Sequence, residues 1–371
     1  MIDRVLNGLR RVVSKWLGLD RLGSDFSSLD LPGKDGLNVM AGIESSWDRP
    51  SDIKQFVLTD MPGRSYRGTI ATTEYERGVE KRLRRHVETL ANEIGIRNTN
   101  RPEGLEKAAE YIEAEFQAMG YETRRLEYRT SDGSPSANIE ALRSSEGPTK
   151  SLVVGAHYDT VDCPGANDNA TGVAALLEIA RSIAESEVEN RLIIRFVAFT
   201  NEEPPYFLTD DMGSMVYAKD LKALGERLEG MICLETIGYY SDAPGSQRLP
   251  TVLSPFFTGD VGDFIAFVSH HASKDFLRDL VGAFRGHAEI PSIGLAGPDM
   301  IQGIDFSDHR SFRTVGYKAV MVTDTAFMRY PYYHTVEDTP DKLDYTRFTK
   351  VTVGLAAAIT DMVRQSDHGD T

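Results

Sequence analysis

The sequence predicts an α/β fold in which a mixed, mostly parallel central sheet carries helices on both faces. Three consecutive segments indicate this fold: apolar runs at 151–156 and 192–199, and an apolar helical stretch at about 172–185 between them. A continuously apolar run of this length is typical of a strand that is buried on both faces. Strand, helix and strand at this spacing form a βαβ unit, which builds a parallel sheet.

Further elements extend this pattern toward both ends of the chain. Apolar residues at helical spacing predict helices, and short apolar runs bounded by turn residues predict strands. The expected elements are helices at 78–95 and 103–119, strands at 121–128, 230–235 and 318–323, and a closing helix at 346–363. Together they predict one α/β domain over residues 76–371.

Residues 1–75 form an N-terminal extension of a different character. Between Ile2 and Leu17 apolar residues recur at helical spacing opposite a basic face, which predicts an amphipathic helix over residues 2–17. Such a helix usually docks on its own protein or on a second subunit, and the alternative is an anionic membrane surface. Residues 20–75 are rich in Gly, Pro, Ser and Asp, which indicates an extended connection or an irregular cover.

Composition narrows the class of protein and its compartment. The 371 residues are 41% hydrophobic, enough for a large core, and the net charge of −15 argues against nucleic-acid binding. With only Cys163 and Cys233, no disulfide framework is expected, and a reducing cytoplasm is the predicted location. No apolar run approaches the roughly 20 residues of a membrane span, and basic residues interrupt the N-terminal apolar pattern where a signal peptide would be continuous.

Imidazole and carboxylate side chains accumulate where the predicted strands end. These residues are His157, Asp159, Asp168, Glu202, Glu203, Glu235, Asp308, His309 and His334. Taken singly, each has an ordinary explanation: Asp168 suits a helix N-cap, and a Glu-Glu pair is usually a solvated loop. Because open α/β sheets bind ligands outside the carboxyl ends of their strands, their joint occurrence instead predicts one site built from zinc-type ligands.

The segments that carry these residues resemble the co-catalytic two-zinc aminopeptidase family, which also contains carboxypeptidase and glutaminyl cyclase relatives. The similar segments are VVGAHYDTVDCPGANDNATGVAALLEIAR, VAFTNEEPP, ICLETIGYY, FSDHRSF and YYHTVEDTPDKLD, in the order of the family's motifs. The resemblance implies that residues 76–371 are a zinc peptidase catalytic domain acting on peptide substrates. The block at 240–305, rich in Gly, Pro and aromatic residues, is then a candidate substrate wall or lid.

The resemblance also implies a set of metal ligands. Two Zn²⁺ ions, for which Co²⁺ or Mn²⁺ could substitute, would be held by His157, Asp168, Glu203, Glu235 and His334. Asp168 would bridge the two ions, each histidine would bind one, and Glu203 and Glu235 would each complete one site. Many family members have Asp where this chain has Glu235.

Two further carboxylates have predicted catalytic roles. Adjacent side chains of an extended segment point to opposite sides, so Glu202 is free to act as general base if Glu203 binds metal. Asp159 would accept a hydrogen bond from His157 and fix the tautomer of that imidazole. Because the histidines must be neutral to bind metal, activity is expected to fall at pH values below the histidine range.

The predicted function is an aminopeptidase that hydrolyses the N-terminal peptide bond. The alternatives are a carboxypeptidase, for which Arg310 and Arg313 would bind a terminal carboxylate, a single-zinc glutaminyl cyclase, or a non-catalytic binding homologue. The complete ligand set and base argue against the cyclase and the binding homologue, while the carboxypeptidase alternative stays open at this point. His309 is expected to have a structural or substrate-side role, and Tyr240, Tyr330 and Tyr333 either donate to an oxyanion or pack around the pocket.

Overall fold

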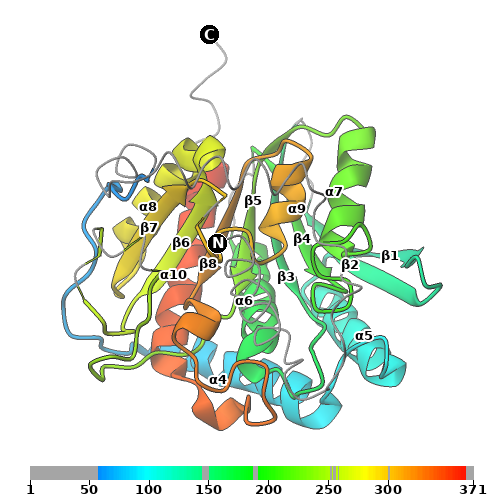
Figure 1. The fold of residues 1–371 in the computed structure, drawn as a ribbon, viewed down its shortest axis with the longest axis horizontal. Helices are drawn as coiled ribbons and strands as arrows, with labels where there is room; N and C mark the ends of the chain where they lie inside the picture. The colour runs from blue at the N-terminus through cyan, green and yellow to red at the C-terminus, as the bar shows by residue number, and fades with distance from the viewer. Residues whose placement is uncertain are drawn as a thin grey trace, which may run out of the picture.

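The computed structural model of the chain describes residues 57–143, 150–186, 191–250, 253, 256–257, 259–299 and 301–364. The amphipathic helix predicted at 2–17 lies outside these residues. The eight strands of the described chain form one sheet in the order β1-β2-β4-β3-β5-β8-β6-β7 (Figure 1). Strands β4, β3, β5 and β8 run parallel in its centre, and antiparallel pairs occur toward both edges, which confirms the predicted mixed, mostly parallel sheet.

The predicted central strands lie within two residues of their expected positions. The strands are β1 (Glu122–Arg129), β2 (Pro135–Arg143), β3 (Ser151–His157), β4 (Ile193–Phe199), β5 (Leu228–Glu235), β6 (Ile265–His270), β7 (Ser292–Gly297) and β8 (Ala319–Thr323). The sequence did not predict β2, β6 or β7. Strands β6 and β7 belong to the 240–305 block, so these two segments are part of the sheet itself, and the connecting loops of the block remain candidates for a wall or lid.

Helices cover both faces of this sheet (Figure 1). They are α4 (Glu74–Glu88), α5 (Pro102–Ala118), α6 (Thr171–Glu185), α7 (Gly213–Ala223), α8 (Lys274–His287), α9 (His309–Thr314) and α10 (Tyr345–Arg364), with a π-helix η3 (Thr89–Ile94) continuing α4. Helices α4, α5, α6, α8 and α10 share the larger apolar core on one face, whereas α7 and α9 pack on the other. Among the described residues, none of the helices combines the length and the apolar character that crossing a membrane requires.

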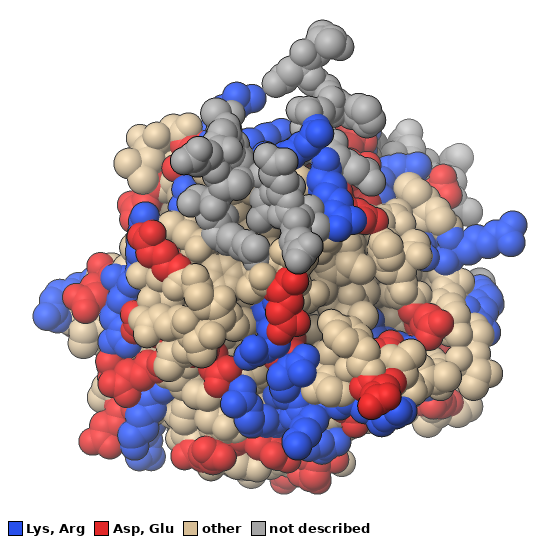
Figure 2. Space-filling model, turned by 180° about the vertical axis from the view of Figure 1, so that it is seen from behind, with Lys and Arg blue, Asp and Glu red and all other residues tan. Residues whose placement is uncertain are grey.

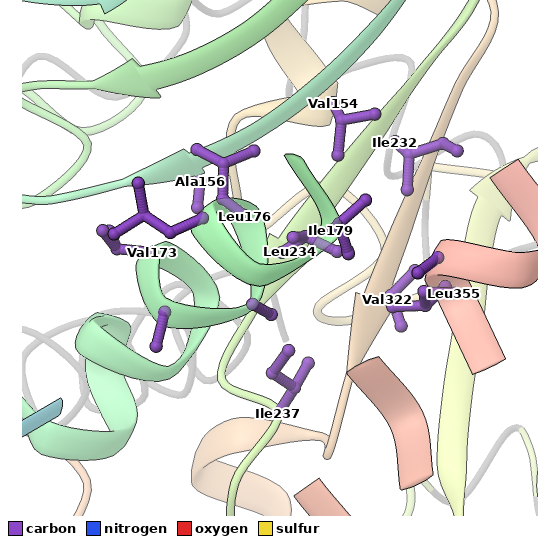
Figure 3. Close-up of a cluster of buried hydrophobic side chains, with 14 of the residues drawn as sticks. Val154, Ala156, Val173, Leu176, Ile179, Ile232, Leu234, Ile237, Val322 and Leu355 are labelled. Carbon is purple, nitrogen blue, oxygen red and sulfur yellow. The ribbon is translucent and has the colours of Figure 1, made fainter. Parts of the chain in front are cut away.

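Alternate residues of the central strands fill the two cores. Figure 3 shows side chains of β3, β5, β8, α6 and α10 gathered in the larger core. On β3, Val154 belongs to this core while its neighbour Val153 belongs to the core under α7. Because both faces of β3 are completely buried, the position of its last residue is fixed by packing as well as by its strand partners.

The first described residues run along one edge of the sheet. Leu58 and Ala296 of β7 exchange two backbone hydrogen bonds of 2.8 and 2.9 Å. The Arg285 guanidinium of α8 donates to the carbonyls of Met61 and Pro62, each at 3.1 Å. This edge segment, residues 57–65, is thus tied to both the sheet and a covering helix.

The surface shown in Figure 2 carries both signs of charge in close alternation. Lys and Arg side chains lie interspersed with Asp and Glu side chains there, and no broad area has a single sign. On this face, therefore, the net charge of −15 does not appear as a continuous acidic surface.

Candidate metal centre

The predicted site residues meet at the carboxyl edge of the parallel strands. His157 is the last residue of β3 and Glu235 is the last residue of β5, and these two strands are parallel neighbours. Glu202 and Glu203 follow β4, which pairs with β3 on its other side. Because β3, β4 and β5 are parallel neighbours, the polar side chains at their carboxyl ends lie close together at one edge of the sheet.

One group of donor atoms forms around the imidazole of His157. Its Nε2 atom lies 3.3 Å from Oδ1 of Asp168 and 3.2 Å from Oε2 of Glu235. These three residues are buried and each offers a nitrogen or oxygen atom within 4.8 Å of the others. The group therefore has the donors and the spacing for one cation.

A second group forms around the imidazole of His334. Its Nε2 atom lies 3.0 Å from Oδ2 of Asp168 and 3.2 Å from Oε1 of Glu203. Asp168 thus turns one carboxylate oxygen toward each histidine. This is the arrangement expected of a carboxylate shared by two cations.

Several donor atoms of the site are buried without a hydrogen-bond partner, as expected of atoms that coordinate a cation. The Nε2 atom of His157, both carboxylate oxygens of Asp168 and Oε1 of Glu203 are inaccessible to water and have no hydrogen-bond partner in the described chain. Leaving polar atoms unsatisfied in this way is costly, and metal coordination would satisfy all four. Imidazole and carboxylate donors suit zinc, cobalt or manganese.

The crowding of carboxylates shifts the pKa values of the site. Burial, together with the nearby charge of Asp168, raises the pKa of Glu203 to about 7. Burial also raises the pKa of Glu202 well above its usual range, with Glu203 and Glu235 adding to the effect. Before a cation binds, both acids therefore retain protons at higher pH than an exposed glutamate does.

Neighbouring carboxylates raise the pKa values of the two imidazoles. Burial alone would lower the pKa of His157, but Glu235 and Glu202 raise it well above its usual range. Glu203 and Asp168 likewise raise the pKa of His334 against the opposing effect of burial. Protons and cations therefore compete for the same nitrogen atoms.

Asp159 organises the turn that carries the two glutamates. Its Oδ1 and Oδ2 atoms accept hydrogen bonds from the backbone N–H groups of Glu202 and Glu203, both at 3.1 Å. The Nδ1 atom of His157 lies 3.2 Å from the backbone carbonyl of Asp159 and 3.5 Å from its carboxylate. The closer imidazole contact is thus to the carbonyl, and the carboxylate mainly fixes Glu202 and Glu203.

Glu202 and Glu203 reach different parts of the site. The Oε2 atom of Glu202 lies 3.9 Å from Nε2 of His157, while Glu203 contacts His334. Glu202 belongs to neither three-residue donor group. Glu202 is therefore a carboxylate at the site that is not needed as a metal ligand.

Sequence reasoning missed two residues that orient the candidate ligands. The Ser307 hydroxyl donates to Oε2 of Glu235 at 2.7 Å. The Asp338 carboxylate accepts from the backbone N–H groups of Asn167 and Asp168, at 2.8 and 3.2 Å, and from the Tyr330 hydroxyl at 2.7 Å. Ser307 and Asp338 lie inside segments that carry the family resemblance, and that position was the only signal in the sequence.

The remaining histidine and tyrosine candidates make contacts within the protein. His309 is buried with its Nε2 atom 2.7 Å from the carbonyl of Ile304, which is a structural contact. The Tyr240 and Tyr330 hydroxyls donate to Ile237 and Asp338, so both are engaged within the protein. Tyr333 stacks on His334 with ring centroids 4.0 Å apart.

Half-buried aromatic rings extend from Tyr333 along one side of the site. Phe327 lies 6.0 Å from Tyr333, Phe306 lies 6.2 Å from Phe327, and Phe207 lies 5.9 Å from Phe306, measured between ring centroids. Phe207 follows the Glu202–Glu203 pair, and Phe306 precedes Ser307. These rings form an aromatic row that starts at Tyr333, which stacks on His334.

Comparison with known proteins places this chain in a family. Residues 138–359 match the model of peptidase family M28. The Escherichia coli (strain K12) protein YfbL is 35% identical over 285 residues, which are 74% of this chain and 86% of that protein. A probable leucine aminopeptidase of Arthroderma otae is 23% identical over 68% of this chain, and the match spans 64% of that longer relative.

Solved structures share the same fold. BSAP, a zinc aminopeptidase from Bacillus subtilis, superimposes with a TM-score of 0.62 at 16% identity, over 78% of this chain and 96% of that chain. A glutaminyl cyclase from Fimbriiglobus ruber gives a TM-score of 0.57 at 21% identity, over 81% and 99% of the two chains. The family model covers more than half of the chain, and the sheet topology agrees with it. The chain belongs to peptidase family M28.

Proposed function

We propose that this M28 peptidase is a zinc-dependent aminopeptidase that releases N-terminal residues from peptides. Its two Zn²⁺ ions would be held by His157, Asp168, Glu203, Glu235 and His334. The observation that carries the proposal is the Asp168 carboxylate, whose two oxygens face two separate histidine–glutamate pairs. A single bound ion would leave one of these buried pairs unsatisfied.

The roles of the protein side chains follow from their positions. Bound zinc ions would lower the pKa of a water molecule toward neutrality and polarise the scissile carbonyl. Glu202 accepts the proton of the attacking water and delivers it to the leaving amine, because it is at the site without being needed as a ligand. Asp159 keeps Glu202 and Glu203 in place through their backbone N–H groups.

Two observations favour an N-terminal over a C-terminal specificity. A carboxypeptidase would need an arginine to bind the terminal carboxylate of its substrate. Arg313, one candidate for that arginine, is paired with Asp305 and Asp299. The leucine aminopeptidase names of fungal relatives point the same way.

Both donor groups are complete, and this favours the two-zinc peptidase over the single-zinc cyclase alternative. A cyclase that used only the His334 group would leave the buried His157 and Glu235 side chains without a cation. A substrate panel that includes N-terminal glutaminyl peptides distinguishes the two activities.

The decisive experiment combines metal analysis with a panel of free and blocked dipeptides. We expect two zinc ions per chain and hydrolysis only of substrates with a free amino terminus. In Glu202→Gln the zinc content should be unchanged while kcat falls by roughly 10²–10⁴-fold, the usual contribution of a general base. Glu337→Gln, which changes an exposed glutamate near His334, serves as the control. Near-normal turnover by Glu202→Gln would refute its assignment as general base.

A further inference from the structure

A completely buried arginine, Arg97, contacts backbone next to two of the candidate metal ligands. It follows the π-helix η3 and is 0% exposed to solvent. In the described chain its guanidinium lies within hydrogen-bond distance, 2.8 to 3.1 Å, of five backbone carbonyls. The two N–H groups of Nη1 are shared among the carbonyls of Leu90, Gly95 and Pro164, while Nε donates to Tyr158 and Nη2 to Gly165. All five acceptors are neutral carbonyl oxygens, so this is not a simple ion pair.

The acceptors come from three segments, two of which carry metal-ligand candidates. Tyr158 directly follows His157 at the end of β3, and the Nε atom of Arg97 donates to its carbonyl at 2.8 Å. Gly165 begins the short segment that contains Asp168, and its carbonyl accepts from Nη2 at 3.1 Å. One rigid, planar group therefore connects the backbone beside His157 with the backbone that leads to Asp168.

Main-chain contacts reinforce this connection. The backbone N–H of Arg97 donates to the Thr160 hydroxyl at 3.1 Å, and the N–H of Thr160 donates to the carbonyl of Arg97 at 2.8 Å. Gly165 has a φ of +61°, and a Cβ there would lie 2.4 Å from the carbonyl oxygen of Asp168 and 3.1 Å from Nη2 of Arg97. The turn thus has room for the guanidinium and not for a side chain of its own.

The charge of Arg97 also matters at this position. Burial lowers its pKa to about 10, so it remains a cation at neutral pH, and the nearby Asp338, Asp159 and Asp168 act to keep it protonated. Burying a cation without a bonded carboxylate costs free energy, which its hydrogen bonds and nearby negative charges have to offset. Here the positive charge is near Asp338, Asp159 and Asp168, whose negative charges repel one another.

We infer that Arg97 is a positioning residue for the metal centre, which holds the backbone around His157 and Asp168 so that these two ligands face each other before a cation binds. The inference rests on the metal centre proposed above. No other side chain offers five donors in a fixed planar arrangement, so lysine should replace it only in part.

The test compares Arg97 with a second buried arginine that is remote from the ligands. Arg195 of β4 is 9% exposed and donates to Ser151, Glu140 and Glu226, at distances between 2.9 and 3.2 Å. The variants Arg97→Met, Arg97→Lys and Arg195→Met are prepared without metal. Their zinc affinity is measured by competition with a chromogenic chelator, and thermal unfolding is followed in parallel.

Both methionine variants should be less stable than the wild type, but only Arg97→Met should bind zinc more weakly. The expected loss is about tenfold or more, which is typical of residues that orient metal ligands, with Arg97→Lys intermediate and Arg195→Met close to the wild type. Wild-type affinity in Arg97→Met, or an equal loss in Arg195→Met, would overturn the inference. If Arg97→Met does not fold, wild-type affinity in Arg97→Lys has the same meaning.

These outcomes are separate from a failure of the proposed function. A wild-type protein that binds no zinc would refute the metal centre itself. A wild-type protein that binds zinc, beside an Arg97 variant that binds it equally well, would refute only the role of Arg97.

Discussion

The two donor groups that share Asp168 are built in different ways. The strand-end group, His157 and Glu235, consists of the last residues of two neighbouring parallel strands. The loop group, Glu203 and His334, lies in connections beyond β4 and β8, and His334 has a φ of +57°, which is uncommon outside glycine. Strand residues are fixed by ladder hydrogen bonds and packing, so the strand-end group should be the better organised before metal binds.

Among changes to the two donor groups, the largest effect is expected from the residue that both groups share. Asp168→Asn keeps the shape of the side chain but removes the negative charge between the two imidazoles. Activity should fall by about a thousandfold, since metal-ion catalysis contributes several kcal/mol to the transition state. Steady-state kinetics at saturating zinc checks this value. Activity within tenfold of the wild type would mean that Asp168 is not a shared ligand.

Removing one histidine from each group tests the difference between them directly. Both His157→Ala and His334→Ala should bind one zinc ion instead of two. The ion that remains in His334→Ala, held by the strand-end group, should be the tighter of the two. Zinc content after dialysis against increasing chelator concentrations measures this order. Two tightly bound ions in either variant would place a ligand elsewhere.

The pH dependence should be steep on the acid side. Neighbouring carboxylates raise the pKa values of His157 and His334, and metal binds only their neutral forms. As pH falls below these raised values, zinc affinity should decrease by about tenfold per pH unit for each proton displaced. Isothermal titration in buffers of different ionisation enthalpy measures both the affinity and the number of protons released. A flat affinity between pH 8 and 6 would contradict the raised pKa values.

The smallest effect concerns a hydroxyl that supports only the strand-end group. Ser307→Ala removes the hydrogen bond to Glu235. The affinity for the zinc ion at the strand-end group should fall by about tenfold, while the affinity for the other ion stays unchanged. Ser311→Ala is the matched control, because the Ser311 hydroxyl contacts Ser214 at 2.8 Å and no ligand. Stepwise zinc titration resolves the two ions. An equal loss of affinity for both zinc ions would show that Ser307 acts on the whole site.

Secondary structure was predicted best where a single local pattern of apolar residues determines it. The buried strands β3 and β4 and the helix between them were predicted to within two residues, because an uninterrupted apolar run has few alternatives. Strands β6 and β7 were missed, since their short segments lie among Gly, Pro and aromatic residues and gain their stability from pairing with distant strands.

The site shows the same division. The sequence suggested His157 and Glu235 because they directly follow apolar strands, and His334 through the family resemblance. It gave no indication that Ser307 would reach Glu235 or that Arg97 would join two ligand-bearing segments. Such contacts join residues more than 60 positions apart, and only the folded chain shows them.

The pairing of Leu58 with Ala296 also bears on how the protein avoids aggregation. A free sheet edge offers unpaired backbone groups to any other extended chain. At the β7 edge the protein's own residues 57–65 occupy part of that template. At the opposite edge β1 carries charged side chains of both signs: Glu122, Arg124, Arg125, Glu127 and Arg129. A fragment that began after residue 65 would keep every candidate ligand and yet expose β7 to its neighbours, so the start of a recombinant version should be chosen upstream of residue 57.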